Sequence, residues 1–158
     1  MRPSRLGVVA VLGALLAGCG LTSSPADGIT FTAPPGWQGS PGIMGFMQFW
    51  KPPGSSDQVL MLFRSPKQVD PNDVFTNAKL KDTRIERKEE IEICGHQPAI
   101  YFAGEGSSSS GGGSRESDLQ MVMSNANGAS YFAMYVYPIG DKPDALAVAA
   151  LRELCAKP

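Results

Sequence analysis

The sequence predicts an α+β domain with a mostly antiparallel sheet of about six or seven strands and two helices, in the order βββαββββα. Two observations support this fold class. Apolar residues alternate with period two in most segments from residue 28 onward, as in half-buried strands, whereas two segments follow the helical period of 3.6 residues. The strand-like segments come in runs and do not alternate singly with helices, which favours antiparallel neighbours joined by short turns.

Three strands are expected before the first helix, over residues 28–33, 43–50 and 58–64. Each is soon followed by proline, at Pro34, Pro52 and Pro66. Because proline lacks the N–H donor that a strand ladder requires, these positions mark the strand ends.

The two helices are expected over residues 70–81 and 143–156. In the first, Asp70 suits the N-cap position and Pro71 suits the first helical position. In the second, Asp141 is a candidate cap, and leucines and alanines recur at helical spacing, which gives the helix one apolar face.

Four strands are expected between the helices. The segment 125–128 reads Asn-Ala-Asn-Gly, which is typical of a tight turn between two strands. The segment 104–114 consists largely of glycine and serine. Such residues bury too little apolar area to offset their ordering entropy, so this segment is expected to be a flexible loop. The four strands are expected at residues 84–94, 99–103, 118–124 and 129–137.

The first eighteen residues have the anatomy of a secretory signal peptide. Arg2 and Arg5 precede a short apolar run, and residues 16–19 read Leu-Ala-Gly-Cys. This ending resembles the bacterial lipobox. The resemblance implies that residues 1–18 are removed and that Cys19 becomes a lipidated N-terminus carrying acyl chains such as palmitate. The alternative is an ordinary secretory signal with an incidental cysteine.

A lipidated Cys19 would anchor the chain to the extracytoplasmic face of a bacterial membrane, since two or three acyl chains suffice for stable anchoring. Residues 19–27 are then a short lipidated tether, and residues 28–158 form a single domain. Export also bears on the two remaining cysteines, Cys94 and Cys155, because an even pair in an oxidising compartment usually forms a disulfide. Two buried free thiols are the alternative.

The charge of the chain argues against nucleic acid as a partner. Loss of Arg2 and Arg5 with the signal segment leaves 12 basic and 15 acidic side chains. A mildly acidic surface without a basic stripe does not suit a phosphate backbone.

No catalytic or metal site is recognisable in the sequence, and no cofactor is expected. His96 is the only histidine, and one histidine beside a disulfide supplies neither a zinc site nor a nucleophilic triad. Four glutamates at 86, 89, 90 and 92 suggest paired carboxylates, but basic residues lie between them, as on a solvated strand face. The sequence therefore favours a protein that is not an enzyme.

Residues 31–37 read Phe-Thr-Ala-Pro-Pro-Gly-Trp, and this strand-to-turn motif resembles the opening of PsbP-like domains. The helix expected after the third strand, the hairpin near Cys94 and the final helix extend the resemblance over nearly all of the mature chain. It implies an α/β/α sandwich and a binding or assembly role. Trp37, His96 and the glycine–serine segment are the candidate contacts.

The sequence hypothesis is therefore a membrane-anchored lipoprotein of the bacterial envelope that acts as a non-catalytic binding or assembly module, with an envelope protein as a possible partner. Two alternatives remain. One is an envelope-stabilising protein without a specific ligand, and the other is an enzyme with an unrecognised site. Many methionines and aromatics fall in the expected strands. If both faces of a strand are apolar, one face must be covered by helices or by a partner.

Overall fold

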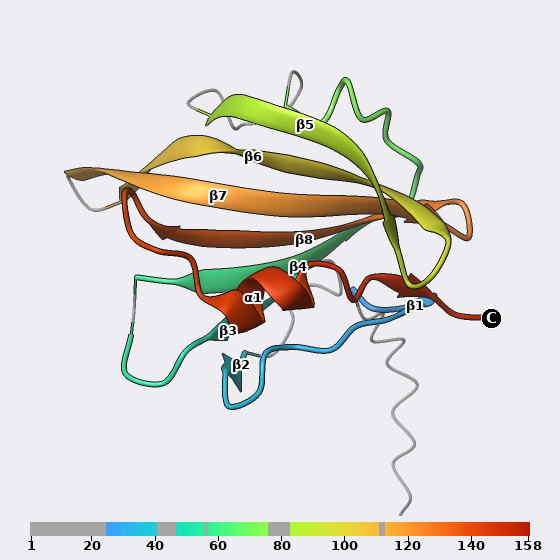
Figure 1. Cartoon of the computed structure of the whole chain (residues 1–158), viewed down its shortest axis with the longest axis horizontal. Coiled ribbons are helices and arrows are strands. Elements are labelled where there is room, and N and C mark those ends of the chain that lie inside the picture. Colours follow the sequence, from blue (N-terminus) through green and yellow to red (C-terminus); the bar gives the residue numbers. More distant parts are fainter. Residues whose placement is uncertain (1–24, 41–46, 56, 76–82, 111–112) are drawn as a thin grey trace, which may run out of the picture.

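The computed structural model describes residues 25–40, 47–55, 57–75, 83–110 and 113–158. Most of them belong to one antiparallel sheet of seven strands in the order β2-β3-β4-β8-β7-β6-β5, and a separate two-stranded sheet pairs β1 with β9 (Figure 1). The elements are β1 (Ile29–Thr30), β2 (Gln38–Gly39), β3 (Met47–Lys51), β4 (Val59–Ser65), β5 (Thr83–Ile93), β6 (Gln97–Ser110), β7 (Gly113–Ala126), β8 (Ala129–Pro138), α1 (Ala145–Ala150) and β9 (Cys155–Ala156).

The α+β prediction with two helices is wrong, and so is the α/β/α sandwich. The chain is mostly β, and the described residues contain one helix, α1, of six residues. It lies against one face of the sheet, in front of the strands in Figure 1. No helix in the described ranges is long and apolar enough to cross a membrane.

The helix expected over residues 70–81 is not formed in its first half, and residues 76–81 lie outside the described residues. Residues 71–75 form turns. The Asp70 side chain accepts a hydrogen bond from the backbone N–H of Asn72 at 2.8 Å, and the Asp70 carbonyl accepts one from Asp73 at 2.9 Å. A capping residue followed by a short turn produces the same local sequence signal as a helix start.

The second helix is shorter than the predicted 143–156. It is capped by Asp144, not Asp141, and the Asp144 carboxylate accepts from the backbone N–H groups of Leu146 and Ala147. The chain leaves the helix after Ala150, and its last residues pair with β1 as strand β9.

The glycine–serine segment 104–114 is not a loop where the structure describes it. Strand β6 continues to Ser110 and β7 begins at Gly113, with Ser107 opposite Glu116 along the ladder. These residues form the hairpin that projects at the left of Figure 1. A backbone ladder needs no large side chains, so the composition did not reveal these strands.

The turn between β7 and β8 agrees with its sequence. Ala126 pairs with Ala129, and the two residues between them, Asn127 and Gly128, have φ angles of 51° and 76°. Two successive positive φ values define the hairpin turn that Asn-Gly favours.

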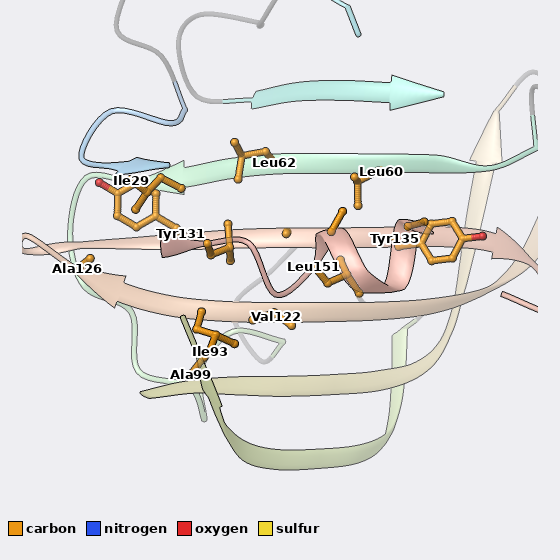
Figure 2. Packing of buried hydrophobic residues seen from close by; sticks show 14 of the residues in the cluster. Ile29, Leu60, Leu62, Ile93, Ala99, Val122, Ala126, Tyr131, Tyr135 and Leu151 are labelled. Carbon is orange, nitrogen blue, oxygen red and sulfur yellow. The ribbon is translucent and has the colours of Figure 1, made fainter. Parts of the chain in front are cut away.

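The main core lies between α1 and the sheet. Figure 2 shows Leu60 and Leu62 of β4 beside Tyr131 and Tyr135 of β8, with Leu151 following the helix. All five side chains are essentially inaccessible to solvent.

The disulfide between Cys94 and Cys155 is present, with a Cα–Cα distance of 5.6 Å. It joins the end of β5 to β9. The strand expected over residues 28–33 is reduced to β1, which pairs with β9 and not with the main sheet. The disulfide and the small sheet together close one end of the domain.

Gln97 is expected to stabilise this closure. Its amide Nε2 donates to Ser124 Oγ and, at 2.8 Å, to the Leu154 carbonyl, while its Oε1 accepts from the Ala156 N–H at 2.7 Å. We expect Gln97→Leu to lower the free energy of unfolding by about 2 kcal/mol, because it leaves partly buried partners unsatisfied. Urea unfolding measures this, with Gln68→Leu at an exposed position as the matched control. Equal stability of the two variants would contradict the assignment.

Candidate functional site

Strands β4 and β8 are apolar on both faces of the sheet. Leu60 and Leu62 point into the core beneath α1, whereas Val59, Met61 and Phe63 alternate with them on the other side. We call this other side, which faces away from α1, the open face. On β8 the residues opposite Val59, Met61 and Phe63 are Val136, Met134 and Phe132.

One half of the open face is covered by the chain that follows β4. Phe75 packs edge-on against Phe102 with ring centroids 5.2 Å apart, and Phe63 stacks on Phe132 at 4.7 Å. The covering segment is fixed at Val69, whose N–H donates to Ser130 Oγ at 2.8 Å. This half of the face therefore forms a second, smaller core.

The other half contains an apolar hollow of about 290 Å³. It lies at the end of the sheet from which the β6–β7 hairpin projects. Apolar side chains from β4, β7 and β8 form its floor, and small or hydroxyl-bearing residues form its rim. The lining residues are Val59, Met61, Leu119, Met134 and Val136 on the floor, with Thr83, Gly106, Ser107 and Ser117 around it.

A second hollow of about 570 Å³ adjoins the first, because Val59 and Met61 line both. Its remaining lining residues are Gln38, Gly39, Ser40, Phe49 and Lys51. We call the two hollows together the trough. It crosses from β6 to β3 over four strand spacings, which amounts to about 19 Å.

The trough has the chemistry of a site for an elongated apolar ligand. Ligand pockets are mostly apolar with a few polar groups that fix orientation. Met61 and Met134 add side chains that adapt to irregular apolar shapes. Its only cation among the described lining residues is Lys51, at the β3 end.

A further hollow of about 580 Å³ lies at the opposite end of the open face, beside edge strand β5. Its rim includes Glu90 and Glu92, both exposed. Solvated carboxylates offer little binding energy, so we favour the trough as the candidate site.

Trp37 packs against the core at its edge. Its ring lies edge-on to Tyr135 at 6.1 Å, on the face of the sheet opposite the trough. Burial raises the pKa of Tyr135, whose hydroxyl accepts from the Asp144 N–H at 3.1 Å and donates to Gln58 at 2.8 Å. Trp37 therefore serves packing in this structure.

His96 lies in the β5–β6 turn with its side chain 98% exposed and one ring nitrogen 3.9 Å from Glu92. Trp37 adjoins β2 and His96 adjoins β5, which are the opposite edges of the sheet. The structure does not bring these two candidate contacts together. Cys19 lies outside the described residues.

The glutamates of β5 are solvated. Glu86 pairs with Arg84, and Glu89 pairs with Arg87. The hydrogen bond between Arg87 and Glu89 raises the pKa of the guanidinium and lowers that of the carboxyl group. Burial raises the pKa of nearby Tyr101, whose hydroxyl donates to Gln120 at 3.0 Å. Within the described ranges, no three His, Cys, Asp or Glu residues are grouped as metal ligands.

Only part of the trough was predicted from the sequence. Met61, Met134 and Phe49 are among the methionines and aromatics that fall in the expected strands, but nothing in the sequence singled out Val59 and Val136. The signal that could have identified them is the uninterrupted apolar run in β4, which indicates a strand buried on both faces.

No protein-family model matches the chain. No curated protein sequence matches it either. Among solved structures, the fold is similar to that of LpqN of Mycobacterium tuberculosis, a protein described as involved in cell envelope biogenesis. The TM-score is 0.46 and the sequence identity is 19%, over 81% of this chain and 82% of LpqN. A similarity of this size supports no argument about function.

Proposed function

We propose that this protein is a lipoprotein of the bacterial envelope, anchored through Cys19, that binds a hydrocarbon chain non-catalytically in the trough. The apolar floor of the trough carries the proposal. Valine, leucine and methionine side chains from three adjacent strands line one hollow there, and hydroxyl groups lie only at its rim. This arrangement suits a ligand with a long apolar part and no charge in its middle.

The proposed location of the protein at a membrane supports a hydrocarbon ligand as well. The signal segment ends in the lipobox-like residues 16–19, and the Cys94–Cys155 disulfide suits an oxidising compartment. A protein held at a membrane by acyl chains is surrounded by hydrocarbon-bearing molecules.

The length of the trough sets the size of the ligand. Carbon–carbon bonds of about 1.5 Å at angles near 111° advance an extended chain by about 1.25 Å per carbon. A trough of about 19 Å therefore holds about 15 carbons. Each buried methylene contributes about 0.8 kcal/mol, so chain length should control affinity.

Equilibrium dialysis with radiolabelled 1-dodecanol tests the proposal. The mature chain, residues 19–158 with Cys19→Ser, avoids the need for detergent. We expect saturable binding, and we expect 1-decanol to bind about tenfold more weakly, because it lacks two methylenes. Absence of saturable binding, or equal binding of the two alcohols, would contradict the proposal.

A blocking substitution at Gly106 gives a second test. A Cβ at Gly106 would meet Leu119 Cδ2 at 3.4 Å and Thr83 Oγ1 at 3.6 Å, both residues of the trough. We expect Gly106→Leu to fill the hollow and weaken dodecanol binding at least tenfold, about 1.4 kcal/mol. Ser114→Leu adds the same side chain to the same hairpin outside the trough and should leave binding unchanged. Thermal unfolding of both variants checks that the fold is intact.

A further inference from the structure

The two ends of the trough differ in charge. At the β6 end, none of the described lining residues is charged. Arg84 on the neighbouring strand β5 forms ion pairs with Glu86 and Glu105, each shorter than 3 Å, so its charge is already compensated. At the β3 end lies Lys51, an exposed ammonium group that lines the second hollow. Among the described residues, no carboxylate forms an ion pair with Lys51.

Strand geometry places Lys51 on the same side as the trough floor. Side chains two residues apart on a strand share a face, so Lys51 lies on the face of Phe49. Phe49 pairs with Met61 of the floor. A chain lying along the floor therefore ends near the Lys51 ammonium group, which no carboxylate of the described residues pairs with.

We infer that the ligand is a long-chain fatty acid, with its alkyl chain along the trough and its carboxylate at Lys51. This inference rests on the proposed function and adds the head group to it. An anionic head complements the only cation on the described lining, whereas a neutral head gains nothing from it. The head remains at the exposed rim, so its carboxylate keeps part of its hydration and loses little on binding.

The expected size of the effect follows from the exposure of Lys51. Exposed ion pairs contribute little and are screened by salt, so we expect dodecanoate to bind about fivefold more tightly than 1-dodecanol in 20 mM salt. The two probes have equal chain length and differ in head charge at pH 8. The preference should fall to less than twofold in 0.5 M salt.

The test is a comparison of dissociation constants for the two probes with the mature chain and three variants. Lys51→Met should abolish the preference for dodecanoate over 1-dodecanol, whatever its effect on the affinity for the alcohol, while Lys51→Arg should retain the preference. Lys67→Met removes an exposed lysine outside the trough and should behave like the parent chain. Because Lys51 has no ion pair among the described residues, thermal unfolding should be unchanged in all three.

The outcomes separate the two claims. Equal affinity for the acid and the alcohol in the parent chain, or a preference that survives Lys51→Met, overturns the fatty-acid inference and leaves the proposed function supported by the dodecanol binding. If neither probe binds, the proposed function fails and the inference fails with it.

Discussion

Replacing both disulfide cysteines, as Cys94→Ala with Cys155→Ala, is expected to lower the free energy of unfolding by about 4 kcal/mol. The bond closes a loop of 62 residues, since the two cysteines are separated by 61 positions. In the chain-entropy treatment, a loop of that length restricts the unfolded chain by about 4 kcal/mol. The loss of stability should be large because the ladder between β1 and β9 contains only two residues of each strand, so the disulfide is the main link at this end of the domain. Urea unfolding of the mature chain measures it.

Reduction provides the matched control for this prediction. A thiol reductant should lower the stability of the parent chain to that of the double variant and should leave the double variant unchanged. Dodecanol binding under native conditions should persist in the folded double variant, because the disulfide lies at the end of the sheet away from the trough. A loss of stability below 1 kcal/mol would mean that the bond contributes little to this fold.

Gly104→Ala is expected to destabilise the protein by about 3 kcal/mol, although alanine is normally tolerated in a strand. Gly104 lies opposite Ile85, next to the register shift between Ile85 and Arg87 that bends β5 over β6. A Cβ at Gly104 would overlap with the backbone carbonyl oxygen of Arg84 and approach the Ile85 Cα to 2.9 Å. Backbone atoms cannot move aside as a flexible side chain can, so the pairing of β5 with β6 must shift.

Gly106→Ala is the matched control, two residues further along the same strand. Its added Cβ would make only ordinary contacts, at 3.4 Å and beyond, and both contacts are with side chains. We expect its stability to lie within about 0.5 kcal/mol of the parent chain. Similar unfolding free energies for the two alanine variants would show that the close approach at Gly104 does not constrain the fold.

The sequence was most informative where side chains alternate or where a turn demands a particular residue. The expected strand at 58–64 corresponds to β4 (Val59–Ser65), and the expected strand at 129–137 corresponds to β8 (Ala129–Pro138). The Asn-Gly turn between β7 and β8 was predicted from the preference of these residues for positive φ. The disulfide was predicted only from the expected export to an oxidising compartment and from the even number of cysteines left after Cys19.

The failures have two physical causes. Around Asp70, a local turn and a helix start share the same capping signal, and only the packing of Val69 and Phe75 onto the sheet distinguishes them. Between Gly104 and Ser110, strand β6 is stabilised by backbone hydrogen bonds with β7. The amino-acid composition of this segment does not indicate such pairing. The trough was only partly predicted for a related reason, since periodicity identifies apolar faces but not which half of a face the described residues cover.

The attachment of β1 has a mechanical consequence. Tyr131 donates a hydrogen bond to the Asp27 carbonyl, and the Lys157 N–H donates one to Gly28. A pull on the chain ahead of Asp27 therefore acts first on this segment, which passes the force to β8 through Tyr131 and to β9 through the β1 ladder. The covalent Cys94–Cys155 link then transfers the force to the β5–β6 hairpin. The trough begins near Ser117, nine residues along β7 from the anchored end at Ala126, a distance of about 30 Å. Force applied ahead of β1 thus enters the domain at the end of the sheet away from the trough.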